Sequence, residues 1–327
     1  MISRFGGLPD RERHDGKGEQ VGEVFELRAG EYGARVDRVG AGLQALTWRE
    51  RDLVWPYTRP EGPLAGQGQV LAPWPNRVAS GRYTFQGTEY RLDVNDPATG
   101  SAIHGLVDGV EWTPVEESEE AVTLRLDFPG TSGYPFPLEL TITYRLSGAG
   151  LTVTTSARNT GTSHAPFGLG FHPYLTLGTP LRDLAERGEA HVEAGIGSYQ
   201  PTDSRMIPEG DPVPVAGGGF NLRAPGRALG TTVLDTAFTD LDRDGEDRAW
   251  VRLSGPEHRV ALWSGPGFSW LQLFSSDTLG GELHRANLAV EPMTCPPDAL
   301  NSGRDLIVLG PGENVERTFG ILAEQLG

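Results

Sequence analysis

Residues 138–157 decide the fold, and they read LELTITYRLSGAGLTVTTSA. On both sides of the link Ser147-Gly148-Ala149-Gly150, mostly apolar side chains occupy every second position, with polar ones between them. This alternation gives a strand one apolar face and one hydrated face, as in an antiparallel sheet. A short link with two glycines is suited to a hairpin. The stretch therefore predicts two long paired strands.

The same period of two recurs along the chain. Further strands are expected at Val24–Arg28, Ala34–Val39, Arg82–Phe85, Val122–Phe128, Trp250–Leu253, Val260–Trp263, Ser269–Phe274, Leu306–Leu309 and Val315–Leu322. Helical periodicity is scarce, and the best short candidate is Leu181–Arg187. The 45 glycines and 25 prolines mark many turns. We predict an all-β protein built as a large antiparallel β-sandwich.

The chain of 327 residues is expected to form one domain over residues 21–327, because no linker or repeat divides it. Gly195–Gly230, rich in loop residues, is expected to be an excursion within that domain. Met1–Gln20 has charge and glycine but no apolar core, so we expect a mobile tail and no secretory signal. With no apolar run of roughly 20 residues to span a bilayer and a single cysteine, Cys295, we expect a cytoplasmic protein.

The charge composition excludes several function classes. The formal net charge is −16, which disfavours binding to nucleic acids and anionic membranes. Lys17 is the only lysine, and it lies in the expected tail, so Schiff-base chemistry has no amine in a pocket. We expect a monomer or a weak homodimer.

Common cofactor and metal motifs are absent or out of context. Gly40–Ala45 matches the loose dinucleotide pattern G-x-G-x-x-A, but a strand-like segment follows it instead of a helix, so we expect a glycine turn. There is no nucleophile elbow and no P-loop. None of the seven histidines are paired at H-x-x-x-H spacing, and a single cysteine cannot build a thiolate site. We therefore expect no cofactor and no metal.

Three histidine or glutamate stretches remain to be explained. His172 stands before Pro173, which cannot donate to a sheet ladder, so pairing is expected to stop there and the histidine to face a cavity. His104 precedes Gly105, which leaves room for a close approach. Glu291 follows an apolar strand and precedes proline, so a half-buried carboxylate needs a partner or a function. A buried structural histidine remains the alternative for both His172 and His104.

Two polar stretches accompany them. Asn76-Arg77 follows two prolines that fix the backbone, and both groups can hydrogen-bond hydroxyls. The alternative is a rigid loop that ends in a surface arginine. Asp235 precedes Phe238 by three residues, a spacing that means little by itself.

Taken in chain order, these stretches resemble the aldose 1-epimerase (galactose mutarotase) family over about Val24 to Leu322. The resemblance rests on Asn76-Arg77, Ile103-His104-Gly105, His172-Pro173-Tyr174, Asp235 with Phe238, Gln272 within Trp-Leu-Gln-Leu-Phe, Glu291-Pro292 and the closing turn Leu309–Glu313. It implies a single-domain β-supersandwich with an open sugar cleft, a small-molecule sugar as partner and no cofactor. It differs from the family pattern at Leu175-Thr176 and at Ser275-Ser276-Asp277, which leaves the identity of the sugar open.

The resemblance also implies residue roles. Glu291 is the catalytic base, His172 the catalytic acid and His104 the second active-site histidine. Arg77, Asp235 and Gln272 contact sugar hydroxyls, and we include Asn76 beside Arg77.

Interconverting α and β anomers requires only a base and an acid, because the anomeric hydroxyl loses a proton while the ring oxygen gains one. We expect an ionised glutamate and a histidine whose cationic form is favoured by the carboxylate. One or two aromatic side chains are expected to stack on the sugar, from the set Trp74, Phe171, Tyr174 and Trp270.

Three alternatives stay open. An epimerase for hexose 6-phosphates would need extra cations at the cleft, and Arg82, Arg285 and Arg304 lie near the motifs without forming a dense cluster. A non-catalytic carbohydrate-binding protein or sensor would need the hydroxyl contacts but no acid–base pair. A polysaccharide lyase or glycoside hydrolase is the third, the hydrolase using two carboxylates, here Asp235 and Glu291.

Overall fold

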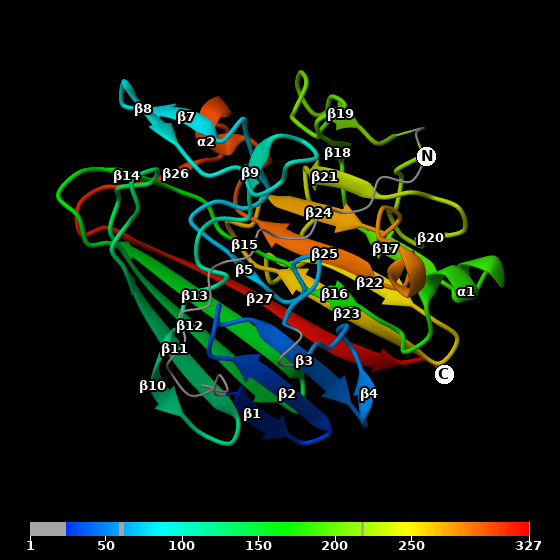
Figure 1. Cartoon of the computed structure of the whole chain (residues 1–327). Helices are drawn as coiled ribbons and strands as arrows, with labels where there is room; N and C mark the ends of the chain where they lie inside the picture. Colours follow the sequence, from blue (N-terminus) through cyan, green and yellow to red (C-terminus); the bar gives the residue numbers. More distant parts are fainter. Residues whose placement is uncertain (1–23, 59–61, 217–218, 327) are drawn as a thin grey trace.

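The structure is a computed structural model that describes residues 24–58, 62–216 and 219–326. The expected N-terminal tail, residues 1–20, lies outside the described residues. Within them the regular secondary structure consists almost entirely of β-strands, as predicted, and the named strands pair antiparallel (Figure 1).

The largest sheet has nine strands in the order β10-β11-β12-β13-β27-β23-β22-β17-β20. Residues 138–157 form its central hairpin, with Ser147 opposite Gly150 at the turn, so the prediction from this stretch is confirmed. The bounds are β10 Thr113–Glu117, β11 Ala121–Phe128, β12 Leu138–Ser147, β13 Gly150–Asn159, β27 Asn314–Gln325, β23 His258–Ser264, β22 Ala249–Ser254, β17 His191–Ala194 and β20 Arg227–Ala228.

Two further sheets lie beside it. The eight-stranded sheet has the order β19-β18-β21-β24-β25-β15-β5, and β16 also pairs with β25. Its bounds are β19 Val213–Pro214, β18 Ser198–Tyr199, β21 Asp235–Thr239, β24 Trp270–Phe274, β25 Leu288–Met293, β15 Gly170–Phe171, β5 Val70–Leu71 and β16 Tyr174–Leu175. The four-stranded sheet consists of β1 Val24–Ala29, β2 Tyr32–Asp37, β3 Leu43–Trp48 and β4 Arg51–Asp52.

Both sheets pack on the same face of the nine-stranded sheet. Tyr144, Val153 and Phe319 lie opposite one another on β12, β13 and β27, so they share one face. Tyr144 donates its hydroxyl to the Ala41 carbonyl beside the four-stranded sheet, at 2.6 Å. Phe319 packs on Phe171 of the eight-stranded sheet, with ring centroids 4.6 Å apart. The apolar face set by the period of two therefore forms one continuous core.

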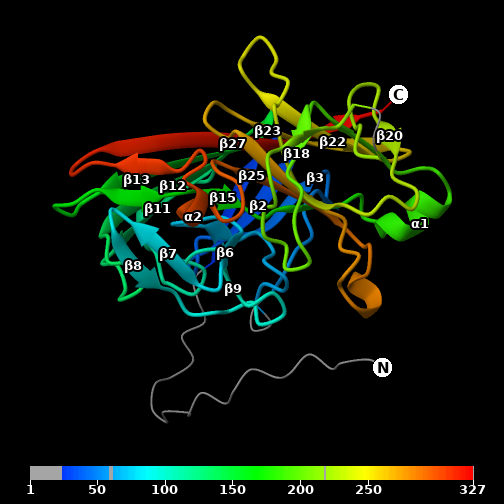
Figure 2. The ribbon, with the colours of Figure 1, turned by 90° about the horizontal axis from the view of Figure 1, so that it is seen from above.

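Short elements cover the remaining edges. Figure 2 shows β6 to β9 gathered at one side of the molecule. The small pairs are β6 Arg77–Ala79 with β9 Ser101–Ile103, β7 Arg82–Phe85 with β8 Thr88–Arg91, and β14 Ala165–Phe167 with β26 Ile307–Leu309. The helices are α1 Leu181–Glu186, α2 Ala299–Ser302 and the 3₁₀ turn η1 Gly281–Leu283, and α1 confirms the one predicted helix. Within the described ranges, no helix is long and apolar enough to cross a membrane.

The excursion at 195–230 is bound into both large sheets. Its β18 pairs with β21 in the eight-stranded sheet, and its β20 pairs with β17 at the edge of the nine-stranded sheet. The excursion therefore belongs to the same unit as the strands on either side of it.

Candidate active site

Three adjacent strands of the eight-stranded sheet present one row of polar side chains. Gln272 on β24 lies opposite Glu291 on β25, and on its other side opposite Ala237 on β21. Asp235 is two residues before Ala237, so it points to the same face. The Gln272 amide donates from Nε2 to Oδ1 of Asp235 at 2.8 Å. Strand register thus brings together Asp235, Gln272 and Glu291, of which the first and the last are 56 positions apart in the chain.

Glu291 lies inside β25 and not at a strand end, which corrects the expectation drawn from Pro292. The strand continues to Met293 because its ladder is already interrupted on the proline side. On that side, Val290 N donates to Pro173 O at 3.0 Å and Thr294 N to Leu169 O at 2.9 Å. Pro292 lies between them and has no N–H to leave unsatisfied.

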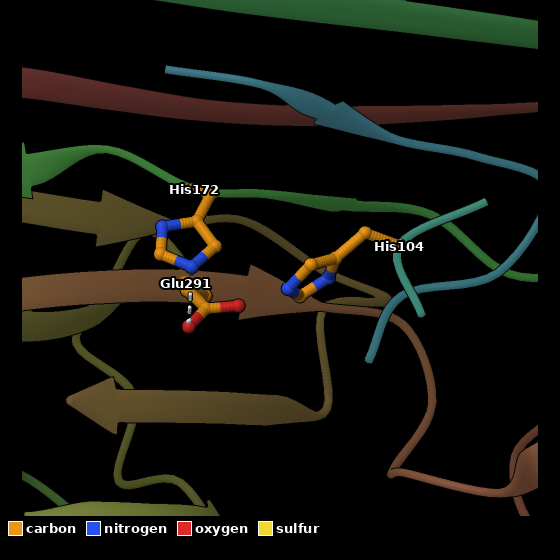
Figure 3. A group of neighbouring side chains, drawn as sticks. All are labelled: His104, His172 and Glu291. Atoms are coloured by element: carbon orange, nitrogen blue, oxygen red, sulfur yellow. Dashed lines mark ion pairs between the residues drawn. The ribbon is translucent and has the colours of Figure 1, made fainter. Parts of the chain in front are cut away.

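His172 occupies that interruption, as predicted, between β15 and β16. Its backbone is held by the preceding loop, since His172 N donates to Gln69 O at 3.0 Å and Gly68 N donates to His172 O at 2.9 Å. Its Nε2 is 3.3 Å from Oε1 of Glu291, and the two side chains expose only 6% and 3% of their surface (Figure 3). The structure therefore brings the predicted acid and base into direct contact.

The second wall of the site comes from the small β6–β9 pair. Arg77 lies opposite Ile103, so Asn76 and His104 are neighbours at the ends of the two strands. His104 N donates to Asn76 O at 3.0 Å, and Asn76 N donates to Nδ1 of His104 at 3.3 Å. The His104 ring meets the His172 ring edge-on, with centroids 5.2 Å apart (Figure 3).

This bond defines the tautomer of His104. Because Nδ1 accepts a hydrogen bond, a neutral imidazole carries its proton on Nε2. His104 therefore offers an N–H donor to the site. The backbone of His104 has φ +66°, a left-handed conformation that is unfavourable for a residue other than glycine. Such a conformation persists only where the surrounding structure fixes it.

Gly105 makes a close approach possible, but to the protein itself. A Cβ at this position would lie 2.0 Å from the Ala72 carbonyl oxygen. Leu106 N donates to the same oxygen at 2.8 Å. Gly105 thus allows the segment after β9, which carries His104, to pack directly against the segment before Asn76.

Burial opposes charge on both members of the acid–base pair. Burial lowers the pKa of His172 to about 4. Burial, followed by the neighbouring Asp235, raises the pKa of Glu291 well above its ordinary value, and Arg77 acts in the opposite direction. In the absence of sugar, burial therefore disfavours both the ionised glutamate and the cationic histidine that the sequence led us to expect.

The other titratable groups follow the same trend. Burial, then His172 and Arg77, lowers the pKa of His104 well below its usual value, so it is a neutral donor. Burial raises the pKa of Asp235, while Arg77 and the Gln272 hydrogen bond lower it. The charge of Arg77 thus acts on the pKa values of His104, Asp235 and Glu291.

One group of three possible metal ligands occurs among the described residues, namely His104, His172 and Glu291. One ligand atom from each lies within 4.8 Å of the others. The proton on Nε2 of His104 opposes metal binding, because an imidazole nitrogen must be unprotonated to ligate. That no metal is required stays a prediction.

The four predicted stacking aromatics are all buried in the protein: Trp74, Phe171, Tyr174 and Trp270 each expose at most 2%. Tyr174 packs beside the His172 ring, with centroids 4.9 Å apart, and donates its hydroxyl to Ala65 O at 2.7 Å. It thereby supports the histidine. Trp55, which packs edge-on against Tyr174, is half-buried and was not singled out in the sequence.

The structure links the seven predicted site residues through hydrogen bonds, ring contacts and strand register, and that they bind sugar stays a prediction. Asn76 differs in role, because its Oδ1 accepts from Arg77 N at 2.9 Å and the residue is buried. Sequence analysis missed Asp96, whose carboxylate binds Arg77. The Asp-Pro pair that begins its tight loop is a turn signal that could have drawn attention to it.

The antiparallel β fold thus carries a buried histidine–glutamate pair beside a row of polar side chains on three adjacent strands. Residues 23–321 match the sequence model of the family described as Aldose 1-epimerase. The chain belongs to this family.

Relatives support the assignment. The uncharacterized protein YihR of Escherichia coli K12 is 36% identical over 307 residues, which cover 93% of this chain and 94% of YihR. Human galactose mutarotase is 28% identical over 348 residues, covering 96% of this chain and 95% of the human protein. The solved structure of an aldose epimerase homologue from C. elegans has a TM-score of 0.82 at 19% identity, covering 94% of this chain and all of that one, and shows the same fold.

Proposed function

We propose that this protein is an aldose 1-epimerase that interconverts the α and β anomers of an unmodified hexose such as glucose or galactose. One observation carries the proposal: Nε2 of His172 lies 3.3 Å from Oε1 of Glu291, in a buried pair beside hydroxyl-binding groups. The family membership and the relatives named as galactose mutarotases support the same activity.

The chemistry needs one mobile proton on a pair of groups. In ring opening, one group takes the proton of the anomeric hydroxyl while the other protonates the ring oxygen. Carbon 1 then rotates about its bond to carbon 2, and the reverse transfers close the ring on the other face. If His172 and Glu291 share one proton, the pair can carry out these two transfers in either direction. In our assignment Glu291 receives the anomeric proton and His172 serves the ring oxygen.

For this assignment, the sugar must shift the resting pair toward a carboxylate and an imidazolium. Hydroxyl groups and the Nε2–H of His104 can hydrogen-bond charged forms that burial alone disfavours. Arg77, Asp235 and Gln272 bind the remaining hydroxyls and hold the ring in one orientation. Such positioning raises the rate because the reacting atoms start near their transition-state geometry.

Two features favour this proposal over the alternatives. The rim arginines named for a phosphate site all pair with carboxylates: Arg82 with Glu89, Arg285 with Asp277 and Arg304 with Asp211. That pairing leaves little excess positive charge for a 6-phosphate. The Oε2 atom of Glu291 is buried and has no hydrogen-bond partner among the described residues, a costly feature that a purely binding protein would not need.

Cys295 is buried and unpaired, in keeping with a reducing cytoplasm as the proposed location.

The test is an NMR saturation-exchange panel on the purified protein in the presence of EDTA. Free glucose, galactose and xylose, glucose 6-phosphate, and a glycoside are supplied separately. We expect anomer exchange above the spontaneous rate for a free aldose. Activity on glucose 6-phosphate alone would favour the phosphate alternative, and glycoside cleavage the hydrolase. Sugar binding without exchange on any substrate would identify a non-catalytic binding protein.

A further inference from the structure

Two consecutive residues in the loop between β8 and β9 contact both segments of the second wall. Asp96 accepts a hydrogen bond at Oδ2 from Nε of Arg77, at 3.0 Å, and each of the two side chains exposes 16% of its surface. Asn95 bonds the backbone of Ile103 twice. Its Nδ2 donates to Ile103 O at 3.0 Å, and its Oδ1 accepts from Ile103 N at 2.7 Å.

These two contacts act on one cross-strand pair. Arg77 lies opposite Ile103 in the β6–β9 ladder, and His104 follows Ile103 directly. Asn95 therefore fixes the strand end from which the His104 ring projects. Asp96 fixes the direction of the guanidinium on the neighbouring strand.

Asp96 is itself held in a tight loop. Its backbone oxygen accepts from Gly100 N at 2.8 Å and from Ser101 N at 3.1 Å. The Thr99 hydroxyl donates to Asp96 Oδ2 at 2.7 Å, and Nε of Arg205, in the excursion at 195–230, donates to Thr99 O at 2.9 Å. The carboxylate thus has a defined position before any sugar binds.

The backbone of Arg77 is held separately, from the other edge of β6. Asp298 N donates to Arg77 O at 2.7 Å, and Oδ1 of Asp298 accepts from Ala79 N at 2.9 Å. Loss of the Asp96 carboxylate therefore frees the guanidinium without releasing the strand. A substitution of Asp96 therefore tests the position of the Arg77 side chain separately from the position of its backbone.

We propose that Asn95 and Asp96 are positioning residues of the sugar site: Asp96 aims the Arg77 guanidinium, and Asn95 aims His104. Because the Asp96 bond uses only the Nε–H of Arg77, the guanidinium has four further N–H groups on its terminal nitrogens for recognition of hydroxyls. The inference rests on the proposed function, since it names which residues prepare that site.

The first test is a double-mutant cycle that combines Asp96→Asn with Arg77→Ala. In the wild-type background, Asp96→Asn should raise KM for the sugar about tenfold, the size of one hydrogen bond to a charged group, with kcat changed much less. In the Arg77→Ala background, the same change should have no further effect. An equal KM increase in both backgrounds, or none in either, would overturn the role of Asp96.

A matched control is available on the nine-stranded sheet. Arg252 pairs with Glu193 at 3.0 Å, and each side chain exposes 25% of its surface. Glu193→Gln removes the same charge from a comparable ion pair away from the site, and KM and kcat should stay at wild-type values. Asn95→Ala should lower kcat in the wild-type background and have no further effect on kcat in the His104→Ala background. A lower kcat in both backgrounds would overturn the role of Asn95.

A second measurement does not depend on turnover. In protein labelled with ¹⁵N-arginine, the Arg77 Nε–H signal is assigned by its loss in Arg77→Lys. Asp96→Asn should shift this signal, while Glu193→Gln should leave it in place. An unchanged signal in Asp96→Asn would refute the proposed contact. A wild-type protein that shows the shift but turns over no aldose would contradict the proposed function and retain the Asp96–Arg77 contact.

Discussion

Burial puts the two central residues in conflict with stability. His172 and Glu291 are more than nine-tenths buried, and burial disfavours the charged form of each. The Nε2–Oε1 contact satisfies only part of the carboxyl group, since Oε2 has no partner among the described residues. Such an arrangement reduces folding stability and is typical of sites where chemistry determines the residues.

The first prediction concerns catalysis by this pair. Glu291→Gln preserves size and removes the base, and His172→Asn removes the acid while retaining some hydrogen bonding. Each change should lower the mutarotation rate by at least about 10²-fold, the typical contribution of such groups. The double mutant should lose much less than the product of the two, because the groups act in one step.

Polarimetry on freshly dissolved α-glucose or α-galactose measures these rates. Binding of a non-reacting sugar analogue should change little in either variant, which separates chemistry from affinity. A near-wild-type rate in purified Glu291→Gln would remove the acid–base assignment.

The second prediction concerns stability and pH. The folded-state pKa of Glu291 is raised, so the folded protein binds this proton more tightly than the unfolded chain, whose value is about 4.3. Wild-type stability is therefore lost as pH rises above that value toward the folded pKa. Glu291→Gln has no such proton, so its gain in melting temperature should be small at pH 5 and larger at pH 8.

Thermal unfolding of both proteins across this pH range gives the comparison. The His172 pKa, lowered to about 4, contributes the opposite slope below about pH 6.5, where falling pH destabilises the folded state. A difference in melting temperature that is constant from pH 5 to pH 8 would contradict the raised pKa of Glu291.

At the scale of elements, two proline-containing segments lie side by side in the eight-stranded sheet. Pro173 interrupts the strand that carries His172, and Pro292 follows Glu291 on β25. Pro292 costs the sheet no hydrogen bond, because its missing donor faces the interrupted ladder. The sequence predicted the interruption at His172 correctly. It predicted a strand end at Glu291 wrongly, because the consequence of Pro292 depends on which strand lies beside it.

The third prediction concerns the join between β9 and the segment that carries Asn76. Gly105 has φ +80°, and an added Cβ would meet the Ala72 carbonyl oxygen at 2.0 Å. Gly105→Ala should destabilise the protein by at least about 1–3 kcal/mol and lower activity through displacement of His104.

Gly109 gives a matched control in the same loop, since a Cβ there would have no heavy atom within 4 Å. Gly109→Ala should change stability by less than about 0.5 kcal/mol. Chemical denaturation and the polarimetric rate provide both readouts. Equal stability of the two variants would show that the close approach at Gly105 is not maintained in solution.

At the scale of the whole molecule, the net negative charge opposes association between two copies of the chain. A net charge of −16 on a 35.2 kDa chain repels a second copy at low salt. The fourth prediction is a molar mass near that of one chain at micromolar concentration, measured by light scattering after size-exclusion chromatography. A weak homodimer would appear as a mass that rises with protein concentration and salt. A mass of two chains at every concentration would contradict the prediction.

The sequence by itself determined the fold class and the family. Alternation over 138–157 depends only on which side chains avoid water, so it specified antiparallel strands without reference to any neighbour. The ordered motifs from Asn76 to Glu291 resemble the aldose 1-epimerase family, and the family model matches residues 23–321. Both kinds of information are local, and the structure preserves them.

The tertiary structure alone decided the direction of the pKa shifts, the side-chain contacts and the strand neighbours. The pKa shifts of His172 and Glu291 come mainly from burial, and tertiary packing also buries the four aromatic side chains that were expected to stack on the sugar. The contact of Asp96 with Arg77 depends on the folded loop between β8 and β9, because 19 positions separate the two residues in the chain. These properties depend on desolvation and on contacts between distant segments, which the order of residues does not express.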